Sequence, residues 1–137
     1  MHLFTYGSLM FDDVWQKLAV GQYATLPASL SGYARKCVND DSYPVVFKSD
    51  VKMTVDGLLY LNVTPQDFAV LDEFEGEYYT REVVEVRLSE GTPLLAATYV
   101  LKDAYRHIAS DQDWDVDCFA NVGIHHFLER YGEELRA

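Results

Sequence analysis

Apolar and polar residues alternate along this chain with two different periods. Short apolar runs bounded by Gly, Pro, Asn or Asp are typical of β-strands, and they recur through the first hundred residues. We predict strands over residues 2–6, 24–30, 32–38, 43–47, 53–63, 79–88 and 94–101. The last two flank a short turn and should form a hairpin. Gly57 inside the longest run predicts a bulge or a close backbone approach.

A helical period occurs at three places, two between these runs and one after the last of them. Residues 12–20 carry an amphipathic pattern, with Asp12 or Asp13 as the expected N-cap. Thr64 followed by Pro65 predicts a second helix start, and we expect this helix to end near Glu73. Residues 117–136 predict a terminal helix. The pattern as a whole predicts an α+β fold with a mostly β centre and short helices at its margins.

Length and composition are consistent with one domain over residues 1–137. The chain is 49% apolar and 14% aromatic, which is typical of a globular protein with a proper core. We see no repeat, no low-complexity tract and no linker. The sequence leaves the oligomeric state open.

Net charge, apolar run length and cysteine spacing together indicate which partners and which cellular location to expect. The net charge of −11 argues against nucleic acid or an anionic membrane as a partner. No apolar run reaches the roughly 18 residues of a membrane span, and the N-terminus lacks a signal-peptide pattern. Cys37 and Cys118 fit no zinc or redox spacing, so we expect free thiols. The predicted location is cytoplasmic.

Residues 71–81, LDEFEGEYYTR, concentrate four carboxylates in eleven positions. Asp72, Glu73 and Glu77 can be explained as solvated residues of a helix end or a turn. Glu75 differs because Phe74 shields one side and Gly76 leaves space on the other. Partial desolvation raises the pKa of a carboxylate toward the range useful for proton transfer at neutral pH. Composition alone still favours a solvated acidic turn.

The N-terminal segment offers a second candidate feature. Gly7 and Ser8 follow the first predicted strand and precede the first predicted helix. Backbone N–H groups of such a loop can converge on a carboxylate or a developing oxyanion. An ordinary strand-to-helix turn is the alternative.

Three groups of residues together resemble the gamma-glutamylcyclotransferase-like family, which includes plant avirulence-induced proteins and gamma-glutamylamine cyclotransferases. They are Tyr6-Gly7-Ser8-Leu9, then Gly32-Tyr33-Ala34 with Tyr43-Pro44, and finally Leu71-Asp72-Glu73-Phe74-Glu75-Gly76. The resemblance covers roughly the first hundred residues. It implies a small, mostly antiparallel β-barrel with short flanking helices and a pocket at one end.

The resemblance also implies an activity. Members cleave a gamma-glutamyl amide by attack of the substrate's own α-amine, which releases 5-oxoproline and an amine or amino acid, without cofactor or metal. The partner is then a small gamma-glutamyl molecule. By the motif match, Glu75 is the general acid/base, and Tyr6, Gly7, Ser8 and Leu9 form the substrate-binding loop. Tyr99 resembles a pocket tyrosine of some members.

Other chemistries find less support in the residues. No Ser/His/Asp or Cys/His set is evident, and His125 and His126 would point about 100° apart on a helix, which disfavours a shared metal ion. One alternative is a binding or regulatory module that keeps the fold without turnover. Another is an amide hydrolase that uses Glu75 to activate water and releases glutamate. The identity of the gamma-glutamyl amide stays open.

Overall fold

The computed structural model describes residues 1–38, 44–50 and 53–114. Its elements in chain order are β1 (His2–Thr5), η1 (Ser8–Met10), α1 (Asp12–Leu18), β2 (Thr25–Ser31), β3 (Tyr33–Val38), β4 (Pro44–Lys48), β5 (Thr54–Tyr60), α2 (Pro65–Glu75), β6 (Tyr79–Leu88), β7 (Pro93–Leu101), η2 (Asp103–Ile108) and β8 (Ala109–Asp113). The predicted terminal helix over residues 117–136, which includes Cys118, His125 and His126, lies outside the described residues.

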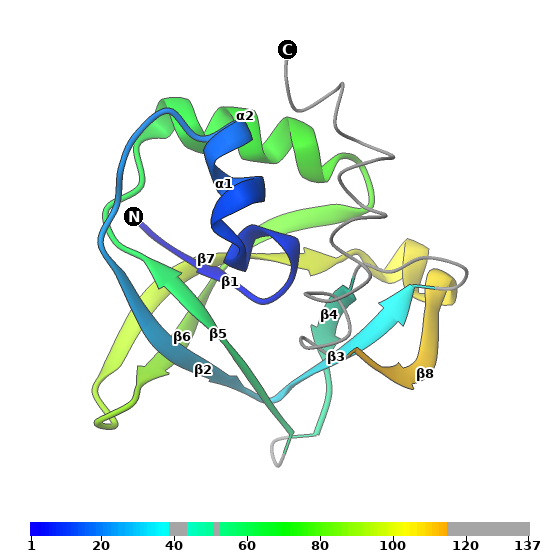
Figure 1. Ribbon diagram of the computed structural model, residues 1–137. Helices are drawn as coiled ribbons and strands as arrows, with labels where there is room; N and C mark the ends of the chain where they lie inside the picture. Colours follow the sequence, from blue (N-terminus) through cyan, green and yellow to red (C-terminus); the bar gives the residue numbers. More distant parts are fainter. Residues whose placement is uncertain (39–43, 51–52, 115–137) are drawn as a thin grey trace.

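Five strands close into a barrel in the order β1-β5-β2-β6-β7 (Figure 1). Every neighbouring pair is antiparallel except β1 and β7, which run parallel. The predicted hairpin is confirmed, because β6 and β7 pair continuously from Tyr79↔Leu101 to Arg87↔Pro93. The α+β class with a small, mostly antiparallel barrel and short helices is therefore confirmed.

Side chains of the barrel strands alternate between the inside and the outside of the barrel, as the pleat of a strand requires. The outer positions are buried where the helices cover them and exposed elsewhere, as at Val83 of β6. One cluster draws on all five strands and fills the barrel: Phe4, Ala28, Leu30, Val55, Leu59, Val84, Val86 and Ala96. The intervening positions pack against the helices in a second cluster, which includes Leu3, Tyr60, Ala97, Tyr99, Val14, Trp15, Phe68 and Leu71. Figure 1 places α1 and α2 together on this side of the barrel.

A second sheet, of order β4-β3-β8, adjoins the barrel. Pro44 is the first residue of β4, an edge strand of this sheet, where a residue without an N–H is tolerated. Strand β8 was not predicted. Its sequence, ASDQD, has low β-propensity and no apolar alternation, so its strand conformation depends on pairing with β3.

The helix boundaries differ from the prediction at informative points. Thr64 caps α2, since its Oγ1 accepts a 3.3 Å hydrogen bond from the Asp67 N–H. The predicted end of this helix was wrong, because α2 continues to Glu75. The N-cap of α1 is Phe11 and not Asp12 or Asp13, and its side chain makes no capping hydrogen bond.

Gly57 permits a close approach between neighbouring barrel strands. A Cβ atom built at Gly57 would lie 2.1 Å from the Thr5 carbonyl oxygen and 2.7 Å from the Phe4 ring. The register runs without a break through Ala28↔Gly57, so the predicted close approach is confirmed and the bulge is not. Within the described residues, no helix is long and apolar enough to cross a membrane.

Candidate active site

Glu75 is the last residue of α2, and Gly76 ends the helix with a φ of 79°. Glu75 is partly buried. A Cβ atom added at Gly76 would meet no other atom within 4 Å, so the space beside Gly76 is open. Burial, and then the negative charge of Asp72, raise the pKa of Glu75 from its ordinary value of 4.5 to about 8. The prediction of a partly shielded carboxylate with a raised pKa is confirmed.

Two buried tyrosines lie within electrostatic range of Glu75. The Tyr6 hydroxyl donates a 2.5 Å hydrogen bond to the main-chain carbonyl of Tyr99. Burial raises the pKa of both tyrosines, and the charge of Glu75 raises each pKa further. The structure thus brings together three predicted site residues, which come from α2, from the end of β1 and from β7.

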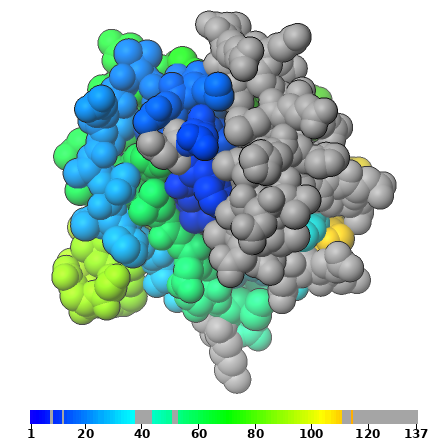
Figure 2. Space-filling model, viewed as in Figure 1, coloured from blue at the N-terminus to red at the C-terminus, as the bar shows by residue number. Residues whose placement is uncertain are grey.

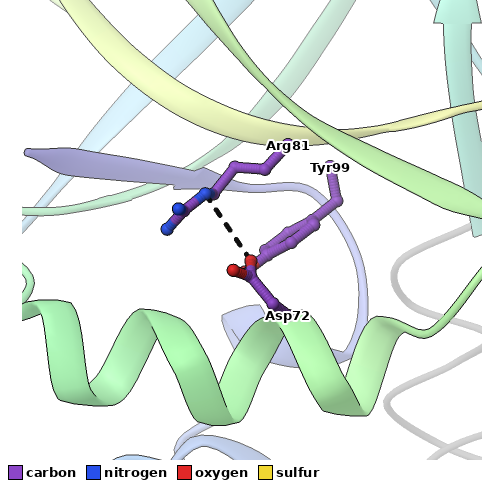
Figure 3. Close-up of polar contacts among 3 residues, drawn as sticks. All are labelled: Asp72, Arg81 and Tyr99. Carbon is purple, nitrogen blue, oxygen red and sulfur yellow. Dashed lines mark hydrogen bonds and ion pairs between the residues drawn. The ribbon is translucent and has the colours of Figure 1, made fainter.

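Asp72 joins the helix to the β6–β7 hairpin at this point. Its Oδ1 accepts a 2.7 Å hydrogen bond from the Tyr99 hydroxyl and lies 3.6 Å from the Arg81 Nε. Figure 3 shows both side chains extending from the strands toward Asp72 on the helix. Arg81 also stacks over the Phe68 ring, with its Cζ 4.4 Å from the ring centroid.

The predicted substrate-binding loop forms the short turn η1. The Met10 N–H bonds the Gly7 carbonyl at 3.0 Å, and Leu9 is buried in the core with its carbonyl bonded to the Tyr60 hydroxyl at 2.9 Å. The first N–H groups of such a turn have no acceptor within it. In Figure 2 dark-blue atoms of the N-terminal part of the chain are visible on this face of the molecule.

The structure also brings the Tyr6-Gly7-Ser8-Leu9 motif against the Pro44 landmark. A Cβ atom at Gly7 would lie 2.5 Å from the Pro44 Cγ and 2.9 Å from its Cδ. Only a glycine fits there without displacing the first residue of β4. Glycine is therefore required at this position of the motif for close packing.

Arg35 of β3 contacts the Tyr6-Gly7-Ser8-Leu9 segment through its guanidinium. The sequence analysis did not identify Arg35 as a residue of the site. Its Nη1 donates to the Tyr6 carbonyl at 2.9 Å and to the Asp56 carbonyl at 3.1 Å. Its guanidinium lies 5.0 Å from the ring centroid of the buried Trp114. Trp114 directly follows β8.

Asp72 was also missed, because it was interpreted as a solvated residue at a helix end. The error has a single cause. A helix that ends at Glu73 separates Asp72 from Glu75, whereas a helix that continues to Glu75 puts the two on the same face, three residues apart. The three-residue spacing of Asp72 and Glu75 can be seen in the sequence. The sequence pattern did not show that the helix extends to Glu75, which is the condition for the two side chains to share a face.

A separate cavity of about 660 Å³ opens beside η1 and α1. Its walls include Met10, Trp15, Tyr23, Leu58 and Tyr60. Among the side chains that the structure describes, no predicted site residue lines this cavity. Among the described residues, no group of three or more His, Cys, Asp or Glu side chains is arranged to hold a metal ion.

The chain is similar in sequence to known proteins. The family described as Gamma-glutamyl cyclotransferase, AIG2-like matches residues 3–116. AIG2-like protein D of Arabidopsis thaliana is 33% identical over 147 residues, which span 98% of this chain and 91% of that protein. The chain belongs to the Gamma-glutamyl cyclotransferase, AIG2-like family.

Solved structures share the fold. A solution structure from Arabidopsis thaliana superimposes with a TM-score of 0.71 at 28% identity and covers 98% of this chain and 81% of that one. A structure titled gamma-glutamyl cyclotransferase superimposes with a TM-score of 0.67 at 16% identity, over 100% of this chain and 86% of that one. At such low identity the second similarity is evidence of a common fold only.

Proposed function

We propose that this protein is a gamma-glutamyl cyclotransferase that converts a gamma-glutamyl amide to 5-oxoproline and a free amine or amino acid. The observation that carries the proposal is the convergence of a partly buried Glu75 with Tyr6 and Tyr99 beside the η1 turn. Membership in the family supports the same chemistry.

Glu75 is suited to move the proton that this reaction requires. The substrate's α-ammonium is not a nucleophile until it loses a proton, and an α-amino group has a pKa of about 8. The pKa of Glu75 is also about 8, so the proton transfer is close to balanced in free energy. A carboxylate of the ordinary pKa would be a much weaker base for this step.

The proposed reaction proceeds in two stages. Glu75 takes a proton from the α-ammonium, and the freed nitrogen attacks the γ-carbonyl carbon to form the ring and a tetrahedral oxyanion. The oxyanion collapses, the bond to the leaving nitrogen breaks, and Glu75 returns its proton to that nitrogen. The second proton of the attacking nitrogen passes to the released amine, which leaves as an ammonium, so that the ring nitrogen keeps one hydrogen and Glu75 is again ionised. Holding the substrate folded for intramolecular attack lowers the barrier by roughly 7 to 11 kcal/mol at most.

The η1 turn supplies the other half of the proposed site. Backbone N–H groups of Gly7, Ser8 and Leu9 would hold the oxyanion or the substrate's α-carboxylate. Tyr6 and Tyr99 would form the wall between this turn and Glu75. The net charge of −11 favours a cationic amine as the leaving group. We further propose a cytoplasmic location, in keeping with cysteines that fit no disulfide framework.

The test is mass spectrometry of the products formed from a panel of gamma-glutamyl amino acids and gamma-glutamyl amines. We expect 5-oxoproline with the wild type and a loss of about 10²- to 10⁴-fold in rate with Glu75→Gln. Glu73→Gln, an exposed charge two residues earlier on the same helix, is the matched control and should keep full activity. Release of glutamate would indicate hydrolysis, and binding without turnover would indicate a binding module; either result would overturn the proposal.

A further inference from the structure

Asp72 and Glu75 are neighbours on one face of α2. Residues three apart on a helix have Cβ atoms about 5 to 6 Å from each other. Both residues lie in the last turn of α2, which runs from Pro65 to Glu75. The side chain of Asp72 is 43% exposed, yet it is directed to the barrel strands by two polar contacts.

The two contacts of Asp72 come from directly opposed residues of the β6–β7 hairpin. Arg81 and Tyr99 are cross-strand partners, so their side chains leave the same face of the hairpin. The Tyr99 hydroxyl donates to the Asp72 Oδ1 at 2.7 Å, and the Arg81 Nε lies 3.6 Å from the same oxygen. Arg81 is also held by its contact with Phe68, one helical turn before Asp72.

Tyr99, which is held by Asp72, in turn contacts the loop that precedes η1. Its main-chain carbonyl accepts the hydrogen bond from the buried Tyr6 hydroxyl. Asp72 is therefore connected through Tyr99 to Tyr6, and through its own helix to Glu75. An ionised carboxylate is the form of Asp72 that accepts both the tyrosine donor and the guanidinium.

We propose that Asp72 is a positioning residue of the Glu75 site, which fixes Tyr99 and holds a negative charge one helical turn from the acid/base carboxylate. Its importance for turnover rests on the proposed function. Like charges at this spacing oppose ionisation of Glu75, so Asp72 keeps that carboxyl a strong enough base to accept the substrate's ammonium proton. This agrees with Asp72 being the second cause, after burial, of the raised pKa of Glu75.

The other titratable and charged groups around Glu75 include two tyrosines and two arginines. Tyr6 and Tyr99 are uncharged at neutral pH because burial raises the pKa of each. The positive charges of Arg35 and Arg81 act on the pKa of Tyr6 and of Tyr99, respectively. Besides burial, the charge of Asp72 raises the pKa of Glu75.

The decisive measurement is an NMR titration of the carboxyl carbon of Glu75, assigned by its disappearance in Glu75→Gln. Asp72→Asn removes the charge but keeps an oxygen that can accept from Tyr99. We expect it to lower the pKa of Glu75 by about one unit. The control Glu73→Gln removes an equal charge from the same helix and should leave that pKa in place. An unchanged pKa in Asp72→Asn, or an equal shift in the control, would overturn the proposal.

Kinetics provide the second readout. The acidic limb of the pH profile of kcat/KM for 5-oxoproline formation should move to lower pH in Asp72→Asn and stay in place in Glu73→Gln. The titration needs no turnover, so the two proposals can fail separately. A wild type that forms no 5-oxoproline would refute the proposed function, while the titration would still decide whether Asp72 controls the ionisation of Glu75.

Discussion

The hydroxyl of Tyr6 donates a 2.5 Å hydrogen bond to the main-chain carbonyl of Tyr99, 93 residues away in the sequence. The bond lies beyond the short parallel ladder in which β1 pairs with β7 at His2↔Ala96 and Leu3↔Ala97. It thereby extends the closure of the barrel to the residue that opens the Tyr6-Gly7-Ser8-Leu9 motif. The position of the η1 turn depends on this closure.

Tyr6→Phe should therefore weaken both the fold and the site. The variant keeps the ring but leaves the buried Tyr99 carbonyl without this donor, at a cost of about 1 to 2 kcal/mol in the free energy of unfolding. Denaturant unfolding measures the loss, and kcat/KM should fall as well. Tyr78→Phe, at an exposed position, is the control. Equal stability of the two variants would contradict a structural role for the Tyr6 hydroxyl.

Gly7→Ala should disturb the site through Pro44. The added methyl group would lie 2.5 Å from the Pro44 Cγ, and Pro44 is followed by the fully buried Val45 and Val46. We expect a loss of about 1 to 3 kcal/mol in stability and reduced turnover. Adding Pro44→Ala removes the obstructing ring atoms, so the double variant should lose less than the sum of the single variants. Additive losses would show that the contact is not the cause.

Asp67 gives the fold a pH-dependent contribution that is independent of the site. Its buried carboxylate accepts hydrogen bonds from the Val20 and Gly21 N–H groups and from the Tyr23 hydroxyl. Burial alone would raise the pKa of Asp67, but these hydrogen bonds outweigh burial and lower it. The contribution is present above the unfolded pKa of about 4 and is lost as pH falls through the folded pKa.

Asp67→Asn should thus destabilise the protein by about 1 to 3 kcal/mol at pH 7. The difference from the wild type should shrink steadily below about pH 4, where the native carboxylate becomes protonated. Thermal unfolding of both proteins across this range measures it. Glu73→Gln, which removes an exposed charge, should change little at either pH. A difference that does not vary with pH would refute the charge-dependent part of the prediction.

Glu75 should have the opposite effect on stability. Its pKa is raised from 4.5 to about 8 in the folded state, so the fold favours the protonated form. The stability associated with that proton is complete below pH 4.5 and is lost as pH rises through about 8. Glu75→Gln cannot ionise and should be more stable than the wild type at pH 9 by about 1 to 3 kcal/mol, a range reduced for partial exposure.

The comparison at low pH provides the control for this prediction. Near pH 4 both side chains are neutral, so the wild type and Glu75→Gln should unfold at nearly the same temperature. A stability gain together with a loss of turnover in Glu75→Gln would be the exchange of stability for activity expected of a catalytic group. If the stabilities of the wild type and Glu75→Gln differed by the same amount at pH 4 and at pH 9, Glu75 would ionise as an ordinary exposed carboxyl.

The sequence by itself determined the features that depend on near neighbours. The β6–β7 hairpin was predicted from two apolar runs around a turn, and the start of α2 from Thr64 and Pro65. Phe74 and Gly76 distinguished Glu75 from the neighbouring carboxylates, although composition alone favoured a solvated turn. These signals act within about four residues, the range over which capping, turn chemistry and helical contacts operate.

Only the tertiary structure decided which distant residues meet. Asp72 contacts Tyr99, Tyr6 bonds Tyr99, and Gly7 packs against Pro44 because the barrel closes between β1 and β7 and the second sheet adjoins it. Strand β8 forms from a polar segment because β3 offers it a pairing edge. Such contacts depend on packing free energy summed over the whole domain, which local propensity does not encode.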